Sequence, residues 1–114
     1  MYWLSMAKNS AFLPGTLDML ILKTLSLGPQ HGYGIAHHIK QTSESVLNVE
    51  EGSLYPALQR LLVQGLVKAE WRLSDTNRRA RYYSLTPAGR KQYGLELSQF
   101  EQLIAAIGRV LQTA

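Results

Sequence analysis

The stretch from Val49 to Leu85, VEEGSLYPALQRLLVQGLVKAEWRLSDTNRRARYYSL, decides the fold prediction. Leucines recur in residues 52–65 at the spacing of one helix face. Residues 67–73 and 81–85 alternate side chains as strands do, and the turn at 74–80 carries two adjacent arginines. A helix followed by a basic two-stranded hairpin is the layout of a winged helix. The prediction is therefore a mainly α (α+β) fold, a winged helix-turn-helix.

The composition of the 114 residues indicates one globular domain. The hydrophobic fraction is 46% and the charged fraction is 18%, which excludes a disordered chain. The formal net charge of +4 favours a polyanionic partner, and a nucleic acid and a membrane surface both fit that sign. The chain has no cysteine, so disulfide bonds and thiolate metal sites are excluded.

The sequence predicts neither a membrane span nor a signal peptide. The longest apolar stretch, 17–27, carries Asp18 and Lys23 and is too short to cross a bilayer. The first five residues lack the charged and then apolar layout of a signal peptide. We therefore expect a soluble cytoplasmic protein without a membrane partner.

Two further helices are predicted before the quoted stretch. The first begins near Pro14, carries Asp18 where an acid complements the helix dipole, and stops at Gly28. The second starts at Gly32 and spans about three turns. Residues 1–13 hold several aromatic side chains without a clear period and are either a frayed tail or a short helix that docks on another surface. Exposed aromatic side chains on a loose tail are unusual, which favours docking.

The remainder of the chain is predicted to be one long helix that begins at Thr86 and Pro87. Apolar side chains then recur as a heptad seam formed by Tyr93, Leu97, Phe100, Ile104, Ile107 and Leu111. One interpretation is that this seam folds back on the core of its own chain. However, a helix of about 25 residues is roughly 40 Å long, more than one small domain covers. We therefore expect part of the seam to pair two chains as a homodimer.

The helix that follows residue 50 has an outward face that suits contact with DNA. Its leucines gather on the opposite side, which is expected to face the core. Small and polar residues on the outer side let a helix approach a DNA groove closely and bond to bases or phosphates. The expected contacts are Ser53, Tyr55, Pro56, Gln59 and Arg60. The alternative is an ordinary surface helix with mixed polar residues.

The hairpin turn adds a concentration of arginine beside this helix. Arginine side chains bond to phosphates in a forked geometry and fit the electronegative minor groove. The expected contacts are Arg78, Arg79, Arg81 and Tyr82. Alone, these charges could simply keep a sheet edge from pairing with other chains. Because they follow a helix with a small polar face, they favour double-stranded DNA as the partner.

No catalytic or metal-binding constellation is predicted. Two of the three histidines, His37 and His38, are adjacent, so they would point about 100° apart on a helix. Neither cysteines nor a cluster of carboxylates accompanies them. The serines have no histidine and acid at a recognised spacing, and no glycine-rich phosphate loop is present. We therefore expect a protein that is not an enzyme and has no metal or cofactor.

Several motifs in the chain resemble the PadR family of transcriptional regulators. They are GTLDMLIL at 15–22, GPQHGYGI at 28–35, EGSLYPALQRL at 51–61, GLV at 65–67, RRARYYSLT at 78–86 and AGR at 88–90. Together they cover about residues 13–97 in the family's order. The resemblance implies a dimeric repressor of the short subgroup, in which a single C-terminal helix pairs the subunits. Its parts would be a winged helix-turn-helix DNA-binding domain at 1–86 and a dimerisation helix at 87–114.

The resemblance also implies roles for the start of the second helix. Gly32 and Tyr33 match residues of a helix that abuts the phosphate backbone of DNA. Gly34 departs from the family, which usually has a larger and often acidic residue there. This departure is expected to loosen the helix.

Some short members of the family bind flat, often cationic drugs between the subunits. Phe100 stands at the position of the aromatic residue that sandwiches the drug. The other matches to pocket-lining positions are Asp18, Met19, Leu22 and Ile104. The alternative is that Phe100 only fills the dimer seam. The ligand that the resemblance implies is a planar aromatic or cationic small molecule that acts as an inducer.

These observations support one function and leave one alternative from a different functional class. The first is a ligand-responsive repressor that binds a pseudo-palindromic operator in double-stranded DNA as a homodimer. The rival is a winged-helix protein-interaction module that touches no DNA. Salt separates the two, because affinity for a duplex falls steeply with ionic strength when a protein neutralises phosphates.

Overall fold

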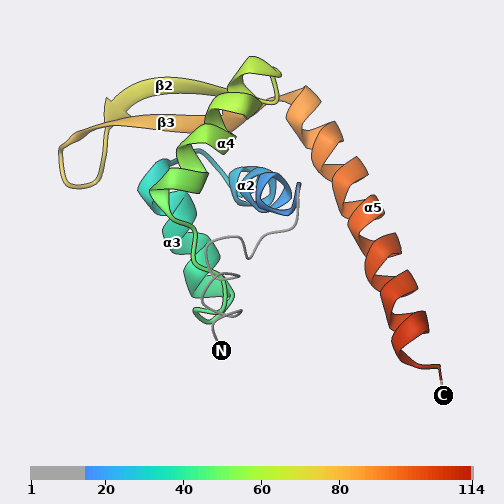
Figure 1. Ribbon diagram of the computed structural model, residues 1–114. Helices are drawn as coiled ribbons and strands as arrows, with labels where there is room; N and C mark the ends of the chain where they lie inside the picture. Colours follow the sequence, from blue (N-terminus) through green and yellow to red (C-terminus); the bar gives the residue numbers. More distant parts are fainter. Residues whose placement is uncertain (1–14, 114) are drawn as a thin grey trace.

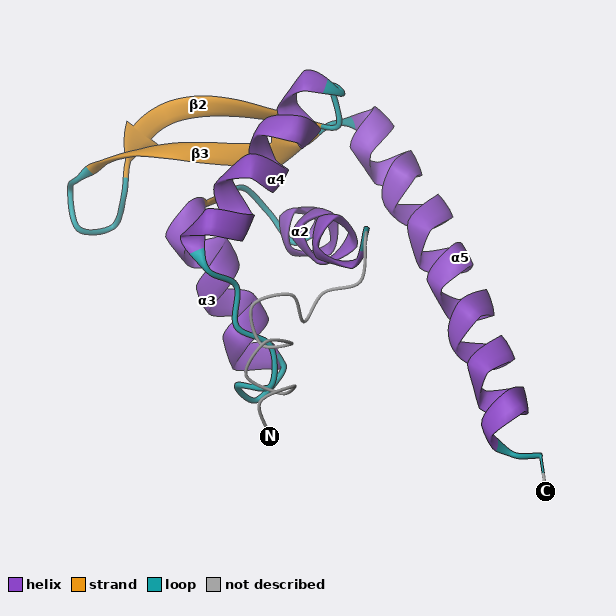
Figure 2. Cartoon of the chain, in the orientation of Figure 1, coloured by secondary structure: helices purple, strands orange, loops and turns teal. Residues whose placement is uncertain are grey.

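The computed structural model describes residues 15–113, which form four α-helices and three β-strands (Figure 1 and Figure 2). In chain order the elements are α2 (Thr16–Ser26), β1 (Gln30–His31), α3 (Gly32–Thr42), α4 (Glu51–Val63), β2 (Val67–Leu73), β3 (Arg79–Leu85) and α5 (Pro87–Leu111). The architecture is the predicted winged helix-turn-helix with a long C-terminal helix. The expectation for residues 1–13 lies outside the described residues.

A small antiparallel sheet forms the wing and joins it to the helices. Its strand order is β1-β3-β2, and the β2–β3 hairpin pairs residues 67–73 with residues 79–85. The sequence predicts two strands, whereas the structure has a third, because β1 pairs with Tyr82 and Tyr83 of β3. A strand of two residues is too short to show alternation, which is why the sequence pattern misses it.

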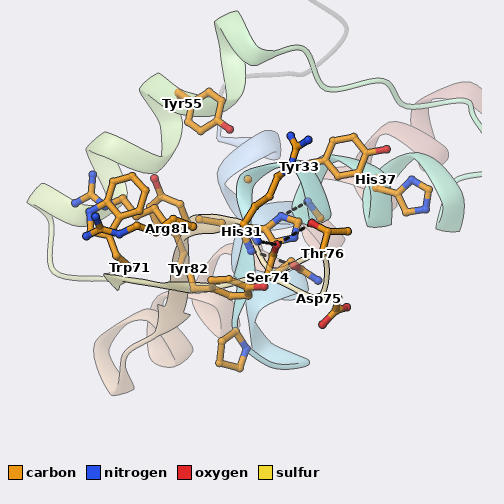
Figure 3. Close-up of a pocket in the computed structure, with 18 residues that line it drawn as sticks. His31, Tyr33, His37, Tyr55, Trp71, Ser74, Asp75, Thr76, Arg81 and Tyr82 are labelled. Carbon is orange, nitrogen blue, oxygen red and sulfur yellow. Dashed lines mark hydrogen bonds between the residues drawn. The ribbon is translucent and has the colours of Figure 1, made fainter.

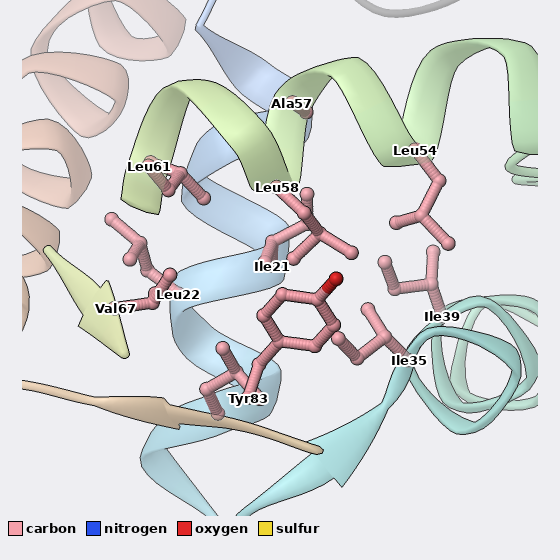
Figure 4. Packing of buried hydrophobic residues seen from close by; sticks show 11 residues of the cluster. Ile21, Leu22, Ile35, Ile39, Leu54, Ala57, Leu58, Leu61, Val67 and Tyr83 are labelled. Carbon is pink, nitrogen blue, oxygen red and sulfur yellow. The ribbon is translucent and has the colours of Figure 1, made fainter. Parts of the chain in front are cut away.

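The hydrophobic core lies between α2, α3, α4 and the base of the sheet (Figure 4). Val67 and Tyr83 close it from the sheet side. The helices contribute Ile21, Leu22, Leu25, Ile35, Ile39, Leu54, Ala57, Leu58 and Leu61, all of them buried. Burying one large aliphatic side chain contributes about 1.5–3 kcal/mol. This packing sets the angle of α4 and the position of the base of the hairpin.

The start of α5 packs against the connection between α4 and β2. The Thr86 hydroxyl accepts a hydrogen bond from the Gly89 N–H at 3.0 Å and donates one to the Gly65 carbonyl oxygen at 2.8 Å. A Cβ at Gly89 would collide with the Leu66 carbonyl oxygen, so this close approach requires glycine. The predicted helix start at Thr86 and Pro87 is confirmed.

Beyond its first turns, α5 runs past α2 and then projects away from the other helices (Figure 1). Tyr93, the first residue of the seam, packs against the core of its own chain. In contrast, Ile104 and Leu111 are 49% and 77% exposed, so residues 15–113 leave the second half of the seam uncovered. None of the described helices combines the length and the apolar character needed to cross a membrane.

Candidate nucleic-acid interface

A groove of about 1120 Å³ opens between the wing and the starts of α3 and α4 (Figure 3). It brings together most of the residues that the sequence assigns to DNA contact: Gly32, Tyr33, Tyr55, Arg78, Arg79, Arg81 and Tyr82. These residues come from three elements that are separate in the sequence. The tertiary fold is therefore what makes them one surface.

Four aromatic rings form a row along the groove. The His31 ring meets the Tyr82 ring edge-on, with 5.2 Å between centroids, and stacks with Tyr33 at 6.3 Å. Tyr33 in turn stacks with His37 at 6.0 Å. The row therefore runs from the wing onto α3. In the sequence the histidines suggested only a metal site, so their place in this row was not expected. The described residues contain no group of three or more side chains placed to hold a metal.

Two side chains surround the backbone at the start of α3, which contains Gly32 and Gly34. The Gly34 N–H donates to His31 Nδ1 at 2.9 Å, which caps the helix. A Cβ at Gly34 would collide with the Gln30 side chain, so that side chain fills the space left by the glycine. α3 is continuous from Gly32 to Thr42, and the loosening expected at Gly34 stays a prediction.

The wing presents arginines whose guanidinium groups lie over aromatic rings. The Arg79 guanidinium is 5.3 Å from the centre of the Trp71 ring, and Arg81 lies over a tyrosine of its own strand. Such stacking limits side-chain motion and leaves in-plane N–H groups for phosphate oxygens. Within the described part of the chain, no salt bridge neutralises these arginines or Arg78. Of the acidic residues described, only Asp75 lines the groove, so the lining is positively charged.

Hydrogen bonds within the turn hold the tip of the wing. The Ser74 N–H donates to the Arg78 carbonyl oxygen at 2.7 Å, and the Asn77 N–H donates to the Ser74 carbonyl oxygen at 2.9 Å. Asn77 has a φ of 61°, a left-handed conformation that asparagine tolerates better than most residues. β3 starts at Arg79 rather than at the predicted Arg81, so the turn is shorter than expected. Arg78 and Arg79 consequently lie where an ordered turn meets a strand.

Tyr55 reaches from α4 to the first residue of α3. A Cβ at Gly32 would lie only 2.6 Å from the Tyr55 hydroxyl oxygen, so the glycine makes room for the ring. Burial raises the pKa of the Tyr55 phenol, and the charge of Glu51 and the neighbouring Tyr83 raise it further. The phenol therefore stays protonated at neutral pH and can donate a hydrogen bond into the groove.

The other residues expected at DNA from α4 lie outside the groove. Ser53, Pro56 and Gln59 are exposed on the outer side of the helix. The Arg60 Nη2 atom bonds instead to Asp18 Oδ1 of α2 at 2.8 Å. An exposed pair of this kind contributes about 0–1 kcal/mol, so its main effect is to direct the Arg60 side chain toward α2.

A second cavity, of about 390 Å³, lies between the start of α2 and the middle of α5. Met19 and Phe100, two of the residues that the sequence assigns to a ligand pocket, line it. The described chain does not bring the other three into the lining. Asp18 is paired with α4, Leu22 is fully buried in the core, and Ile104 lies further along α5.

Polar residues that sequence reasoning does not single out complete this cavity. Gln92 Nε2 donates to Glu96 Oε2 at 2.9 Å, whereas Glu96 Oε1 is buried without a hydrogen-bond partner among the described residues. Gln99 also lines the cavity. A buried oxygen without a partner is costly, so the cavity suits a ligand that donates a hydrogen bond or carries positive charge. On a helix surface such residues look ordinary, which is why the sequence contains no signal for them.

Sequence reasoning also misses groove residues on the wing and on β1. Trp71 lies opposite Arg81 in the hairpin. This pairing can be derived from the sequence by aligning the two strands on either side of their turn. The sequence therefore contained a usable signal for Trp71. It contained none for His31, because β1 is only two residues long and pairs with a strand about fifty positions away in the chain.

Comparisons with known proteins agree with this geometry. The Transcriptional regulator PadR-like family matches residues 21–99. An uncharacterized 37.1 kDa protein in transposon TN4556 of Streptomyces fradiae is 41% identical over 97 residues. These residues are 85% of this chain but 26% of that protein, so the chain spans about a quarter of that relative's length.

Solved structures of transcriptional regulators share the fold. One from Clostridium thermocellum has a TM-score of 0.77 and 30% identity, and the match covers 84% of this chain and 93% of that one. A PadR family transcriptional regulator from Eggerthella lenta has a TM-score of 0.76 and 30% identity, with 89% of this chain and 86% of that one covered.

Proposed function

The chain belongs to the PadR-like family of transcriptional regulators, and from this premise we propose that it is a repressor that binds double-stranded DNA. It acts as a homodimer on a pseudo-palindromic operator and responds to a small molecule. Proteins of this family regulate transcription and are not enzymes.

The observation that carries the proposal is the positively charged groove between α3, α4 and the wing. Arg78, Arg79 and Arg81 border it from the wing, and Tyr33 and Tyr55 border it from the two helices. Arginine and tyrosine side chains bond to phosphate oxygens, which fixes a protein's position on a duplex. The exposed polar residues of α4 remain free to meet base edges in the major groove. A duplex against α4 would therefore contact two helices and the wing together.

The projecting half of α5 supports a homodimer. Ile104, Ile107 and Leu111 are exposed along this half of the helix, and an apolar stripe of this length is unfavourable in water. Twofold pairing would cover it with the same residues of a second copy. It would also hold two grooves at a fixed spacing, and two equivalent grooves read a pseudo-palindromic site.

The cavity between α2 and α5 supports a response to a ligand. Phe100 and Met19 offer apolar surface to a planar molecule, and Glu96 offers a buried oxygen that lacks a partner. A planar cation would satisfy both features. Since α2 also bonds to α4 through Asp18 and Arg60, a ligand that shifts α2 would bias the position of α4.

The salt dependence of duplex binding tests the proposed function. We would measure fluorescence anisotropy with a labelled duplex of about 30 base pairs, long enough for two half-sites. Binding should be detectable at low salt and fall steeply as salt is added, because phosphate contacts release counterions. A chain that binds no duplex at low salt would instead be a protein-interaction module, and the proposal would be wrong.

A further inference from the structure

His31 lies at the junction of β1 and α3, where it caps the helix with its side chain. Its Nδ1 accepts the Gly34 N–H at 2.9 Å and so satisfies one of the amide donors left free at a helix start. Because Nδ1 accepts this bond, the hydrogen of the neutral ring is on Nε2. Histidine is not among the usual capping residues, so this use of His31 calls for a reason.

The same residue is bound to the wing. His31 pairs with Tyr82 in the sheet, and the two rings meet edge-on with 5.2 Å between centroids (Figure 3). Tyr82 also contacts Arg72 of β2, the strand on the other edge of β3, and the guanidinium of Arg72 is 4.2 Å from the centre of the ring. One residue therefore connects the first turn of α3 with the strand that carries the wing arginines.

Gln30 reinforces this connection. Its Oε1 accepts the His31 N–H at 3.0 Å, and its side chain fills the space beside Gly34. The backbone from Gln30 to Gly34 is thus fixed by two side chains. Tyr33, which is 74% exposed, lies between these fixed positions and stacks on His31.

We propose that His31 is a positioning residue of the DNA interface, which acts through its cap on α3 rather than by touching DNA. The cap holds the first turn of α3 against β3, so that Tyr33 and the wing arginines can meet one duplex at the same time. This inference rests on the proposed function, because it concerns the same groove. It assigns a role to a residue that neither the helix pattern nor the basic turn indicates.

Two substitutions separate the cap from the ring. In His31→Asn the side-chain oxygen can still accept the Gly34 N–H, because asparagine is a good capping residue. In His31→Phe the ring is kept, but the acceptor is lost. His38→Ala is the matched control, since His38 lies on the helix that His31 caps and does not line the groove.

Duplex affinity at low salt is the first measurement. We expect His31→Phe to weaken binding about fivefold, which corresponds to the roughly 1 kcal/mol of a lost cap. His31→Asn and His38→Ala should stay within about twofold of the original chain. His38→Ala should also leave the slope of log affinity against log salt unchanged, because it removes no phosphate contact. If His31→Phe bound normally while His31→Asn was weak, the ring alone would matter and the inference would be wrong.

Amide exchange at Gly34, measured by NMR without DNA, is the second measurement. The original chain and His31→Asn should protect this amide, and His31→Phe should lose the protection. Normal protection in His31→Phe would disprove the cap whatever the DNA result. If the original chain bound no duplex, the proposed function would fail. If it bound duplex, and His31→Phe lost the protection but not the affinity, only the present inference would fail.

Discussion

The helices α4 and α5 both carry a stripe of large aliphatic residues, but the protein covers only one of the two stripes. Leu54, Leu58 and Leu61 of α4 are almost wholly buried, each at 2% exposure or less. In α5 the only buried residue is Gly89, and the second half of its stripe, from Ile104 to Leu111, is exposed. A periodic apolar pattern therefore predicts a helix and its apolar face. It does not predict which surface packs against that face.

The difference follows from where each helix lies in the fold. α4 packs against α2, α3 and β2, so three elements of the same chain cover its leucines. α5 contacts α2 and β3 with its first half and then extends beyond them (Figure 1). The orientation of α4 is thus set within one chain, whereas the described part of the chain leaves the second half of α5 uncovered.

Leu58→Ala and Leu111→Ala make the same change on the covered and the uncovered stripe. Leu58→Ala should lower the free energy of unfolding by about 2–5 kcal/mol, because it leaves a cavity in a packed core. Leu111→Ala should lower it by less than about 0.5 kcal/mol in dilute protein, since an exposed residue leaves no cavity. Urea denaturation at low protein concentration measures both. Equal losses in the two variants would contradict the comparison.

Ile104→Asp tests whether a second chain covers the stripe of α5. A carboxylate there would be buried without a partner in a dimer, so dimerisation should weaken at least about a hundredfold. Sedimentation velocity would then show a monomer. Gln102→Asp is the matched control, because it adds the same charge to the same helix outside the seam and should leave the dimer intact. If Ile104→Asp sedimented as a dimer, the seam would not be the interface.

Removing Arg78 and Arg79 together tests the surface that α4 shares with the wing. The slope of log affinity against log salt should become shallower by about 1.8, because each lost phosphate contact removes about 0.9. All duplexes should be weakened to a similar extent. The control replaces Arg90 and Lys91 of α5 by alanine, which removes the same charge away from the groove. Equal slopes in the two double variants would show that only net charge matters.

Phe100→Ala tests the part of α5 that faces its own chain, and its effect should be the smallest. Loss of an aromatic face should weaken binding of a planar cationic dye by about three- to tenfold, the cost of one stacking contact. Leu95→Ala is the control, because this residue is exposed and does not line the cavity. Fluorescence titration measures both variants. Unchanged dye affinity in Phe100→Ala would remove Phe100 from the pocket.

Much of the fold could be read from local patterns. The leucine spacing in 52–62 predicted the buried face of α4, and alternation predicted the β2–β3 hairpin. The capping threonine Thr86 and the proline after it predicted where α5 begins. Each of these signals acts over a few neighbouring residues, within one turn or one hairpin.

The parts of the site that were missed depend on residues far apart in the chain. β1 becomes a strand only because it pairs with β3, where His31 meets Tyr82. Arg60 turns away from the groove because it bonds to Asp18, which lies 42 positions earlier in the chain. Leu22 matched a pocket position by resemblance, yet the packing of three helices buries it completely. Local patterns carry no information on such contacts.

By itself the sequence determined the helices, the hairpin, the positive charge of the wing and the apolar stripe of α5, because periodicity, caps and turns are properties of adjacent residues. Only the tertiary structure decided that His31, Tyr55 and the wing arginines border one groove, and that the core leaves Ile104 and its neighbours on α5 uncovered. The physical reason is that packing of α2, α3, α4 and the sheet, and not the local propensity of any one segment, sets which distant side chains meet.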